Sequence, residues 1–204
     1  MSNIVFEVGM SLDGFIAGPN GGPDNPIGDG GTDIHLWMYE LKSWRKRLGM
    51  EGGIENQNDK IMRHSFERAG AYIMGRRMFD EGEQGWPEEP PFRAPVYVLT
   101  NHPRDPWVRK GGTTFTFVTE GIESALEQAK EAAGDKDIKI AGGADTIQQF
   151  LQVGLIDEFT IHLAPIFIGS GVRLFDAAVL RELEFEKEEV LDSPLVTHLR
   201  YKIK

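Results

Sequence analysis

The residues most suited to chemistry are two adjacent glycines, Gly142 and Gly143, within residues 138–151. This stretch predicts a short apolar strand, a glycine turn and a helix. Glycines at such a turn leave the backbone bare, so a ligand can approach the first amides of the helix. Those amides lack partners within the helix, and the helix dipole makes that end positive. The pattern indicates a site for a phosphate-bearing ligand such as a nucleotide, although a plain tight connection has the same sequence signature.

Two further strand ends carry groups that bind phosphate. Gly75, Arg76 and Arg77 follow one predicted strand, and Thr100 and Asn101 follow the next. Ligands of open α/β sheets bind beyond the carboxyl ends of the strands, and arginine pairs with phosphate through two parallel hydrogen bonds. With the glycine turn, these strand ends suit a dinucleotide that carries an additional phosphate. A simpler interpretation stays open for each of these groups alone. Gly75 can serve only to turn the chain, and the two arginines can form a solvated first turn of a helix. The residues at Thr100 and Asn101 can form an ordinary loop.

The elements that must position these residues alternate between strands and helices. Hydrophobic patterns predict strands over residues 4–9, 71–75, 95–100, 113–119 and 157–164, and helices over residues 33–48, 61–70 and 122–133. Around the glycine turn they predict a strand that begins at residue 138 and a helix that ends at residue 154. Alternation of this kind predicts a mainly parallel sheet. Two final strands, over residues 183–190 and 195–203, predict an antiparallel hairpin at the sheet edge. We expect one α/β domain of three layers spanning residues 1–204.

A long loop and the helix behind it are the candidate substrate side. Residues 18–31 are rich in glycine, proline and aspartate, which predicts either an active-site lid or a disordered insertion. In the helix that follows, Asp33 comes next to Thr32 and is a candidate helix cap. Trp37 and Met38 are either walls of a pocket or core residues at helical spacing.

Composition narrows the functional classes. The chain has 204 residues, a formal net charge of −10 and no cysteine. An acidic chain is not expected to bind nucleic acid. The lack of cysteine excludes disulfides, thiolate zinc sites and a cysteine nucleophile. We see no signal peptide and no apolar stretch long enough for a membrane. We therefore expect a cytoplasmic protein with no metal site and no nucleic acid or membrane partner.

Several motifs resemble a known superfamily in order and spacing. Those that resemble dihydrofolate reductase are Met74-Gly75-Arg76-Arg77, Leu99-Thr100, Ile140-Ala141-Gly142-Gly143 and Asp13-Gly14-Phe15-Ile16-Ala17. Those that resemble the reductase domain of the riboflavin-pathway bifunctional deaminase-reductase are Ser11-Leu12-Asp13-Gly14 and residues 154–175. The chain is identified as a member of the dihydrofolate reductase-like superfamily, with most resemblance to stand-alone riboflavin-type reductase domains.

The resemblance implies a three-layer dihydrofolate reductase-like fold and an NADPH-dependent reductase, in a homodimer, of a small pyrimidine- or pterin-like heterocycle. For the cofactor it implies Ile16 and Ala17 at the nicotinamide, Gly75, Arg76 and Arg77 on phosphates, Thr100 and Asn101 near the adenosine 2′-phosphate, and Gly142, Gly143, Ala144, Asp145 and Thr146 around the pyrophosphate. For the substrate side it implies Asp33 or Glu40 as the acid that assists protonation, Trp37 and Met38 beside the substrate, and Gly171 in a turn that helps close the site.

The chain also departs from both relatives. Without cysteine it cannot build the zinc site of the deaminase half. The helix start that binds ribose phosphate in the riboflavin-type reductase is replaced by residues 75–79. An activity like 5-amino-6-(5-phosphoribosylamino)uracil reductase is the expectation. The alternatives are a dihydrofolate reductase proper, a nucleotide-binding module without turnover and a dimeric structural protein.

Overall fold

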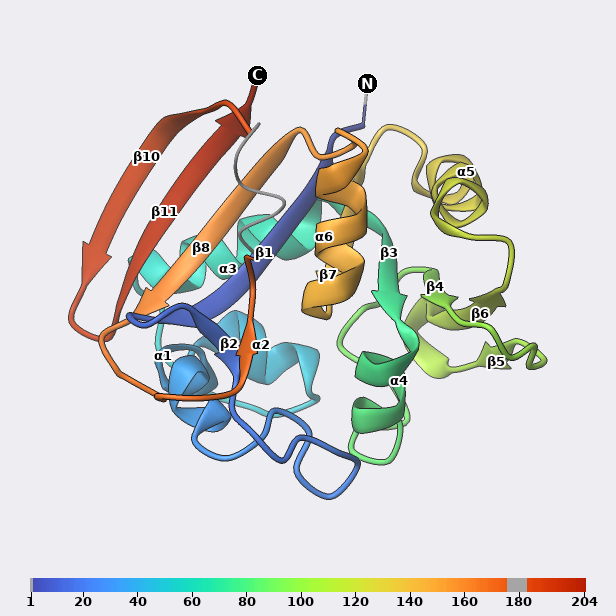
Figure 1. Ribbon diagram of the computed structural model, residues 1–204. Coiled ribbons are helices and arrows are strands. Elements are labelled where there is room, and N and C mark those ends of the chain that lie inside the picture. The colour runs from blue at the N-terminus through green and yellow to red at the C-terminus, as the bar shows by residue number, and fades with distance from the viewer. Residues whose placement is uncertain (1, 176–182) are drawn as a thin grey trace.

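The computed structural model describes residues 2–175 and 183–204. Over these residues the core is a nine-stranded sheet in the order β10-β11-β8-β1-β7-β3-β4-β6-β5 (Figure 1). Its strands are β1 (Ile4–Ser11), β3 (Ala69–Gly75), β4 (Val96–Leu99), β5 (Trp107–Val108), β6 (Thr114–Val118), β7 (Asp137–Gly142), β8 (Glu158–Ala164), β10 (Phe185–Ser193) and β11 (Val196–Ile203). Two short strands, β2 (Phe15–Ala17) and β9 (Val172–Arg173), form a separate antiparallel pair.

The sheet is parallel through its centre and antiparallel at both edges. Neighbouring strands from β8 to β6 run parallel. The hairpin of β10 and β11 joins β8 in an antiparallel manner, as β5 joins β6. The predicted mixed sheet with an antiparallel C-terminal hairpin is therefore confirmed. Strand β5 was not predicted, because two residues are too few to show a period.

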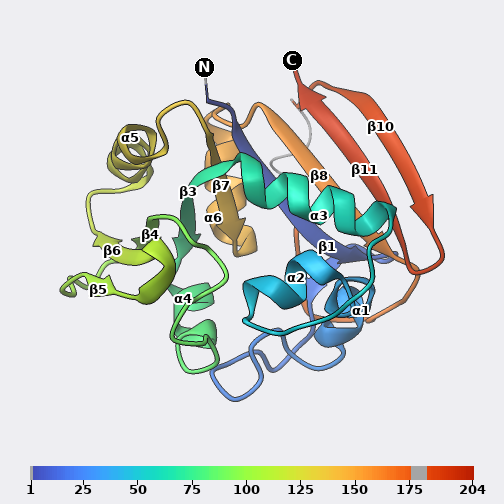
Figure 2. The ribbon, with the colours of Figure 1, turned by 180° about the vertical axis from the view of Figure 1, so that it is seen from behind.

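Helices cover both faces of this sheet. They are α1 (Leu36–Tyr39), α2 (Lys42–Arg47), α3 (Gln57–Arg68), α4 (Arg76–Gly82), α5 (Ile122–Ala133) and α6 (Ala144–Gln152). Helix α6 crosses the front of the sheet in Figure 1, and α3 crosses the back, as Figure 2 shows. Apolar residues of α5 and α6 share one buried cluster with β1, β3, β7 and β8. The three predicted layers are present.

Strand β1 shows how the two faces of the sheet differ. Successive side chains of a strand point to opposite faces. Ile4 and Phe6 are buried in the cluster beneath α5 and α6. Glu7 lies on the other face, where Ser65 of α3 contacts it. One face of the central strand therefore contributes to the apolar core and the other carries a charged group.

The predicted helix over residues 33–48 is wrong as a continuous element. A 3-10 helix, η1 (Gly31–His35), comes first, and α1 and α2 follow. Between them Leu41 has extended backbone, with φ −71° and ψ 135°. Its side chain is buried in a cluster with Trp37 and Met62. Helical spacing of apolar residues could not reveal this break, because the buried side chains face the same core on either side of it.

Two ends of helices also differ from prediction. Helix α3 begins before residue 61 because Oδ1 of Asn56 accepts a hydrogen bond from the amide of Asp59 at 3.0 Å, which caps the helix. Asp33 is not a helix cap, as one interpretation held. It lies inside η1, whose capping position is Gly30 and has no side-chain cap.

Candidate functional site

A cavity of about 440 Å³ lies beside β1 and at the ends of β3, β4 and β7. That volume is in the range of small-molecule sites. Its walls include ten residues predicted to bind a cofactor: Ile16, Ala17, Gly75, Arg76, Arg77, Gly142, Gly143, Ala144, Asp145 and Thr146. Among the residues that the structure describes, Thr100, Asn101, Asp33, Trp37, Met38 and Gly171 are not in these walls. The residues that follow β3 and β7 therefore converge on one cavity, whereas β4 contributes its last residue, Leu99, and not Thr100 or Asn101.

The start of α6 forms one wall of the cavity. The first hydrogen bond of the helix runs from the amide of Ile147 to the carbonyl of Gly143, at 3.1 Å. The amides of Ala144, Asp145 and Thr146 precede that bond, and no side chain caps this end. A methyl group at Gly143 would meet no atom within 4 Å. These amides are therefore open to a ligand, and the positive end of the helix favours an anion.

The start of α4 lies against the start of α6. Strand β3 ends at Gly75, which immediately precedes α4. A Cβ atom at Gly75 would come within 2.5 Å of Oγ1 of Thr146. A glycine is needed here so that the two strand-to-helix turns can lie side by side. Their closeness brings the amides of α6 and the arginines of α4 into one wall.

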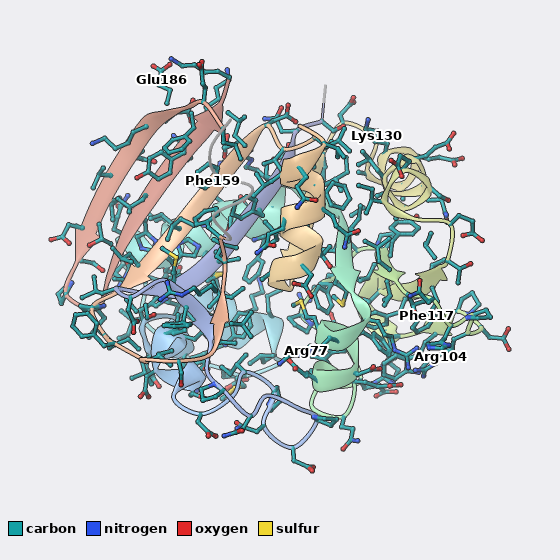
Figure 3. All side chains as sticks on the ribbon, in the orientation of Figure 1. Arg77, Arg104, Phe117, Lys130, Phe159 and Glu186 are labelled. Carbon is teal, nitrogen blue, oxygen red and sulfur yellow. The ribbon has the colours of Figure 1, made fainter. Side chains whose placement is uncertain are left out.

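Both arginines of α4 are oriented by carboxylates one turn later. Nε of Arg76 donates to Oδ1 of Asp80 at 2.6 Å, and Nε of Arg77 donates to Oε1 of Glu81 at 2.7 Å. Within the described part of the chain, the terminal nitrogens of both guanidinium groups make no hydrogen bond. Figure 3 shows Arg77 between the first turn of α4 and the lower end of α6. This end of the cavity therefore offers cations as well as helix amides.

The opposite end of the cavity is built around Glu7, which the sequence analysis did not single out. Oε2 of Glu7 accepts hydrogen bonds from Nζ of Lys139 at 2.8 Å and from Oγ of Ser65 at 2.6 Å. Burial alone would raise the pKa of Glu7, but Lys139 and His162 outweigh burial and hold this pKa well below its ordinary value. Glu7 is therefore a carboxylate at neutral pH.

His35 is the second polar group at this inner end. Its ring lies on Gly9 of β1, where a Cβ atom would come within 2.8 Å of Cε1 of His35. Burial, with a smaller contribution from His162, lowers the pKa of His35 to about 4. The imidazole is therefore neutral at pH 7 and carries one donor nitrogen and one acceptor nitrogen.

Two further histidines lie behind the inner end. Nδ1 of His162 lies 2.7 Å from Nδ1 of His198, and Nε2 of His198 lies 3.2 Å from Oδ1 of Asn58. Burial and the nearby His162 lower the pKa of His198 to about 3. Trp37 packs against both rings, with centroids 4.9 and 5.0 Å away. Trp37 is thus a core residue that supports the site, as one of its two interpretations held.

The loop over residues 18–31 is a folded wall of the cavity. Pro26 and Ile27 line the cavity. The side chains of Asn20 and Asn25 donate to the carboxylate of Asp29 at 2.7 and 2.8 Å. The interpretation of this segment as a disordered insertion is therefore wrong, while its role as a lid stays a prediction.

The Ser11-Leu12-Asp13-Gly14 motif fastens the turn that carries Gly171. The carboxylate of Asp13 accepts hydrogen bonds from Oγ of Ser11 and from the amides of Ile168 and Gly169, at 2.6, 3.2 and 2.7 Å. This contact holds β9 against β2, so that Val172 reaches the cavity wall. Gly171 supports the wall from behind, since a side chain there would collide with the carbonyl of Ala17.

Glu7 and His35, which were not predicted as site residues, differ in the sequence signal that could have identified them. Glu7 interrupts an apolar strand, Ile4–Ser11, and an acidic residue within a buried strand is unusual unless it is paired. That signal could have identified it. His35 had no comparable signal, because its place beside Gly9 depends on how η1 folds back on β1.

The described residues offer no metal cluster and no membrane-spanning helix. No group of three or more His, Cys, Asp or Glu side chains in this part of the chain could hold a metal ion. No helix within the same residues has the length and apolar character needed to span a membrane.

Comparisons with known proteins agree with this architecture. Residues 2–197 match the family described as RibD C-terminal domain. The uncharacterized proteins YwjB and YyaP of Bacillus subtilis (strain 168) are 28% and 29% identical over 174 residues. These alignments cover 84% of this chain and 81% and 79% of the two relatives.

Solved structures share the fold over the whole chain. A putative riboflavin biosynthesis protein from Shewanella sp. PV-4 has a TM-score of 0.67 and 26% identity, over 100% of this chain and 99% of that one. A dihydrofolate reductase from Enterococcus faecalis, complexed with NADP(H) and RAB-propyl, has a TM-score of 0.57 and 10% identity, over 98% and 96%. A third structure has a TM-score of 0.62 and 14% identity, over 100% of this chain and 57% of that one. It is a diaminohydroxyphosphoribosylaminopyrimidine deaminase/5-amino-6-(5-phosphoribosylamino)uracil reductase from Thermotoga maritima. At these identities the last two show the fold alone.

Proposed function

Because the chain belongs to the RibD C-terminal domain family, we propose that it is an NADPH-dependent reductase of a pyrimidine- or pterin-like heterocycle. The family and its structural neighbours are reductase-like domains of the riboflavin-pathway type. The observation that carries the cofactor proposal is the convergence of the bare α6 amides with Arg76 and Arg77 on one cavity.

The residues present fit a dinucleotide phosphate. The amides of Ala144, Asp145 and Thr146 would hold the pyrophosphate, since they lack helical partners and Gly143 leaves room beside them. Arg76 and Arg77 would pair with phosphate oxygens. Thr100 and Asn101 lie outside the cavity walls but follow β4, beside β3, and stay our candidates for the adenosine 2′-phosphate.

The nicotinamide would lie along the apolar wall formed by Ile16 and Ala17, between the phosphate end and the inner polar end. Bound there, the cofactor would supply a hydride to an electrophilic carbon of the substrate. The protein's part is to orient the two rings and to exclude water. Pro26 and Ile27 of the loop over residues 18–31 provide the apolar cover on that side.

The predicted proton donor, Asp33, has no support from the geometry, because it is exposed and not in the described cavity walls. Glu7 is held as a carboxylate and His35 as a neutral imidazole. We propose that water supplies the proton of the reduction, while Glu7 and His35 hold the substrate.

The test is NADPH oxidation, followed by loss of absorbance at the NADPH band. The candidate substrates are 5-amino-6-(5-phosphoribosylamino)uracil, its dephosphorylated form and dihydrofolate. We expect turnover of a pyrimidine compound that depends on both substrate and protein. Turnover of dihydrofolate alone would identify a dihydrofolate reductase proper. Binding of NADPH without turnover of any compound would favour a nucleotide-binding module, and absence of NADPH binding would overturn the proposal.

A further inference from the structure

The inner end of the cavity holds polar atoms that are not suited to bind the phosphate groups of a cofactor. Every side-chain hydrogen bond that Glu7 makes within the described residues is to Oε2. The Glu7 side chain keeps 18% of its surface accessible, and Glu7 lines the cavity. Oε1 is therefore an acceptor that no donor of the described residues occupies, on a side chain that lines the cavity.

Glu7 is also fixed in position and in charge. Lys139 and Ser65 both donate to Oε2, and Nζ of Lys139 donates in turn to Oγ of Ser65 at 2.6 Å. Nε2 of His162 lies 3.8 Å from the same oxygen. A carboxylate held in this way accepts hydrogen bonds and cannot donate one. The group that meets Oε1 must therefore carry an N–H or O–H.

His35 offers the complementary half of this arrangement. Its ring nitrogens have no hydrogen-bond partner within residues 2–175 and 183–204, and His35 lines the same cavity. The ring lies on Gly9, two residues along β1 from Glu7 and on the same face. The backbone positions concerned, Glu7 and Gly9, are about 7 Å apart along the strand. Glu7 and His35 therefore lie on one face of β1, within reach of neighbouring atoms of one small ring.

The two ends of the cavity also differ in charge. Arg76 and Arg77 keep terminal nitrogens free of hydrogen bonds within the described residues, and the start of α6 adds the positive end of a helix dipole, so this end attracts phosphate. At the inner end the positive charge of Lys139 is paired with Glu7, and Glu7 offers only acceptor atoms. A phosphate-bearing cofactor is thereby directed to one end, and the inner end is left for an uncharged ring.

We propose that Glu7 and His35 determine substrate specificity by binding the cis-amide edge of a heterocycle, as found in uracil and in the lactam of a pterin. The ring N–H donates to Oε1 of Glu7, and the adjacent carbonyl accepts from the ring of His35. This assignment rests on the proposed function for its biological meaning, since it names the substrate class of the same site. It can nevertheless be tested without any turnover.

The test uses lumazine, which is fluorescent and carries ring N–H groups beside carbonyls, and 1,3-dimethyl-lumazine, in which both ring N–H groups are blocked. Each compound is titrated into the protein at pH 7, both alone and saturated with NADP⁺. We expect lumazine to bind the wild type at least tenfold more tightly than its dimethyl derivative. A site built to hydrogen-bond an N–H leaves a buried polar group unpaired when that N–H is missing.

The variant Glu7→Gln keeps an oxygen for Lys139 and Ser65 but turns an amide NH₂ toward the cavity. We expect it to abolish the preference for lumazine while its thermal unfolding stays close to that of the wild type. Glu7→Asp, which keeps the charge, should keep part of the preference. His35→Phe should weaken the binding of lumazine several-fold. Glu123→Gln on the exposed face of α5 is the matched control and should bind as the wild type does.

Three results would overturn the proposal: no binding of lumazine, equal binding of the two compounds by the wild type, or an unchanged preference in Glu7→Gln. Loss of the preference in Asp33→Asn instead would assign the role to Asp33. The proposed function fails separately. If the protein prefers lumazine through Glu7 but binds no NADPH, this inference stands and the proposal of an NADPH-dependent reductase is wrong.

Discussion

The two ends of the cavity are built in different ways. The phosphate end consists of residues that are consecutive in sequence, Gly75-Arg76-Arg77 and Gly142–Thr146, at the ends of two parallel strands. The inner end consists of Glu7 and His35, brought together by the folding of η1 onto β1. The first end uses backbone amides and partly exposed cations, whereas the second uses half-buried side chains whose charge is set by their surroundings. We infer that the first end binds the cofactor and the second selects the substrate.

The largest expected effect at the phosphate end is that of Gly143→Val. The backbone at Gly143 has φ −69°, which any residue can adopt, and a Cβ atom there would meet nothing within 4 Å. The side chain would instead occupy the space beside the helix amides. We expect NADPH affinity to fall at least a hundredfold, measured by calorimetry, with little change in thermal unfolding.

Gly85→Val is the control for this variant. Gly85 is exposed, and a Cβ atom there would come no nearer than 3.8 Å to the carbonyl of Gly82. The Gly85→Val variant should bind NADPH as the wild type does. Unchanged affinity in Gly143→Val would show that the α6 amides do not hold the cofactor.

A smaller effect is expected from the double variant Arg76→Gln/Arg77→Gln. Charge-assisted hydrogen bonds contribute about 1.5–3 kcal/mol when protected, and solvent screening reduces this for the partly exposed arginines. We expect NADPH to bind roughly tenfold more weakly, with a shallower dependence of affinity on salt concentration. Lys60→Gln/Arg63→Gln, which removes two exposed cations from α3, is the matched control. Equal weakening in both double variants would point to net charge rather than to contact.

The smallest expected effect is on stability, and it concerns the inner end. His35 and His198 have folded pKa values of about 4 and about 3, below the ordinary 6.5. The unfolded chain therefore binds more protons than the folded one between these values, and their contribution to stability, complete above pH 6.5, is lost as the pH falls. The charged and titratable groups facing them are Glu7, Lys139 and His162. Below pH 4.5, protonation of Glu7 in the unfolded chain adds to the loss.

Urea unfolding at pH 7, 6 and 5 measures this effect. The slope per histidine has an upper bound of about 1.4 kcal/mol per pH unit. His35→Gln should reduce the slope between pH 6.5 and 5. The exposed His64 provides the control, and His64→Gln should leave the slope unchanged. If His35→Gln and His64→Gln have the same slope as the wild type, His35 is not buried in the neutral form.

The contrast between the two ends also explains what the sequence could and could not reveal. The glycines and arginines of the phosphate end follow apolar strands directly, so local patterns found them. The resemblance implies Asp33 as the acid of the substrate side because it lies on the predicted first helix, but η1 leaves its side chain exposed. Thr100 and Asn101 follow β4, whose last residue, Leu99, lines the cavity, but the two residues themselves are not in the described walls. The homodimer and the cytoplasmic location stay predictions.

Sequence patterns found the sheet because its strands are apolar and separated by helices. They could not find the break at Leu41, since both sides of it bury apolar residues in one cluster. They could not find His35 either, because nothing local distinguishes a histidine that lies on a glycine of a distant strand. Contacts between segments far apart in the chain decide both features.

The central claim, that the cavity binds NADPH through its phosphate end, is tested most directly by calorimetric titration of the wild-type protein with NADPH and with NADH. We predict saturable binding of one NADPH per chain with a Kd below about 100 μM, and weaker binding of NADH, which lacks the 2′-phosphate. A titration with no saturable heat for either nucleotide would contradict the account.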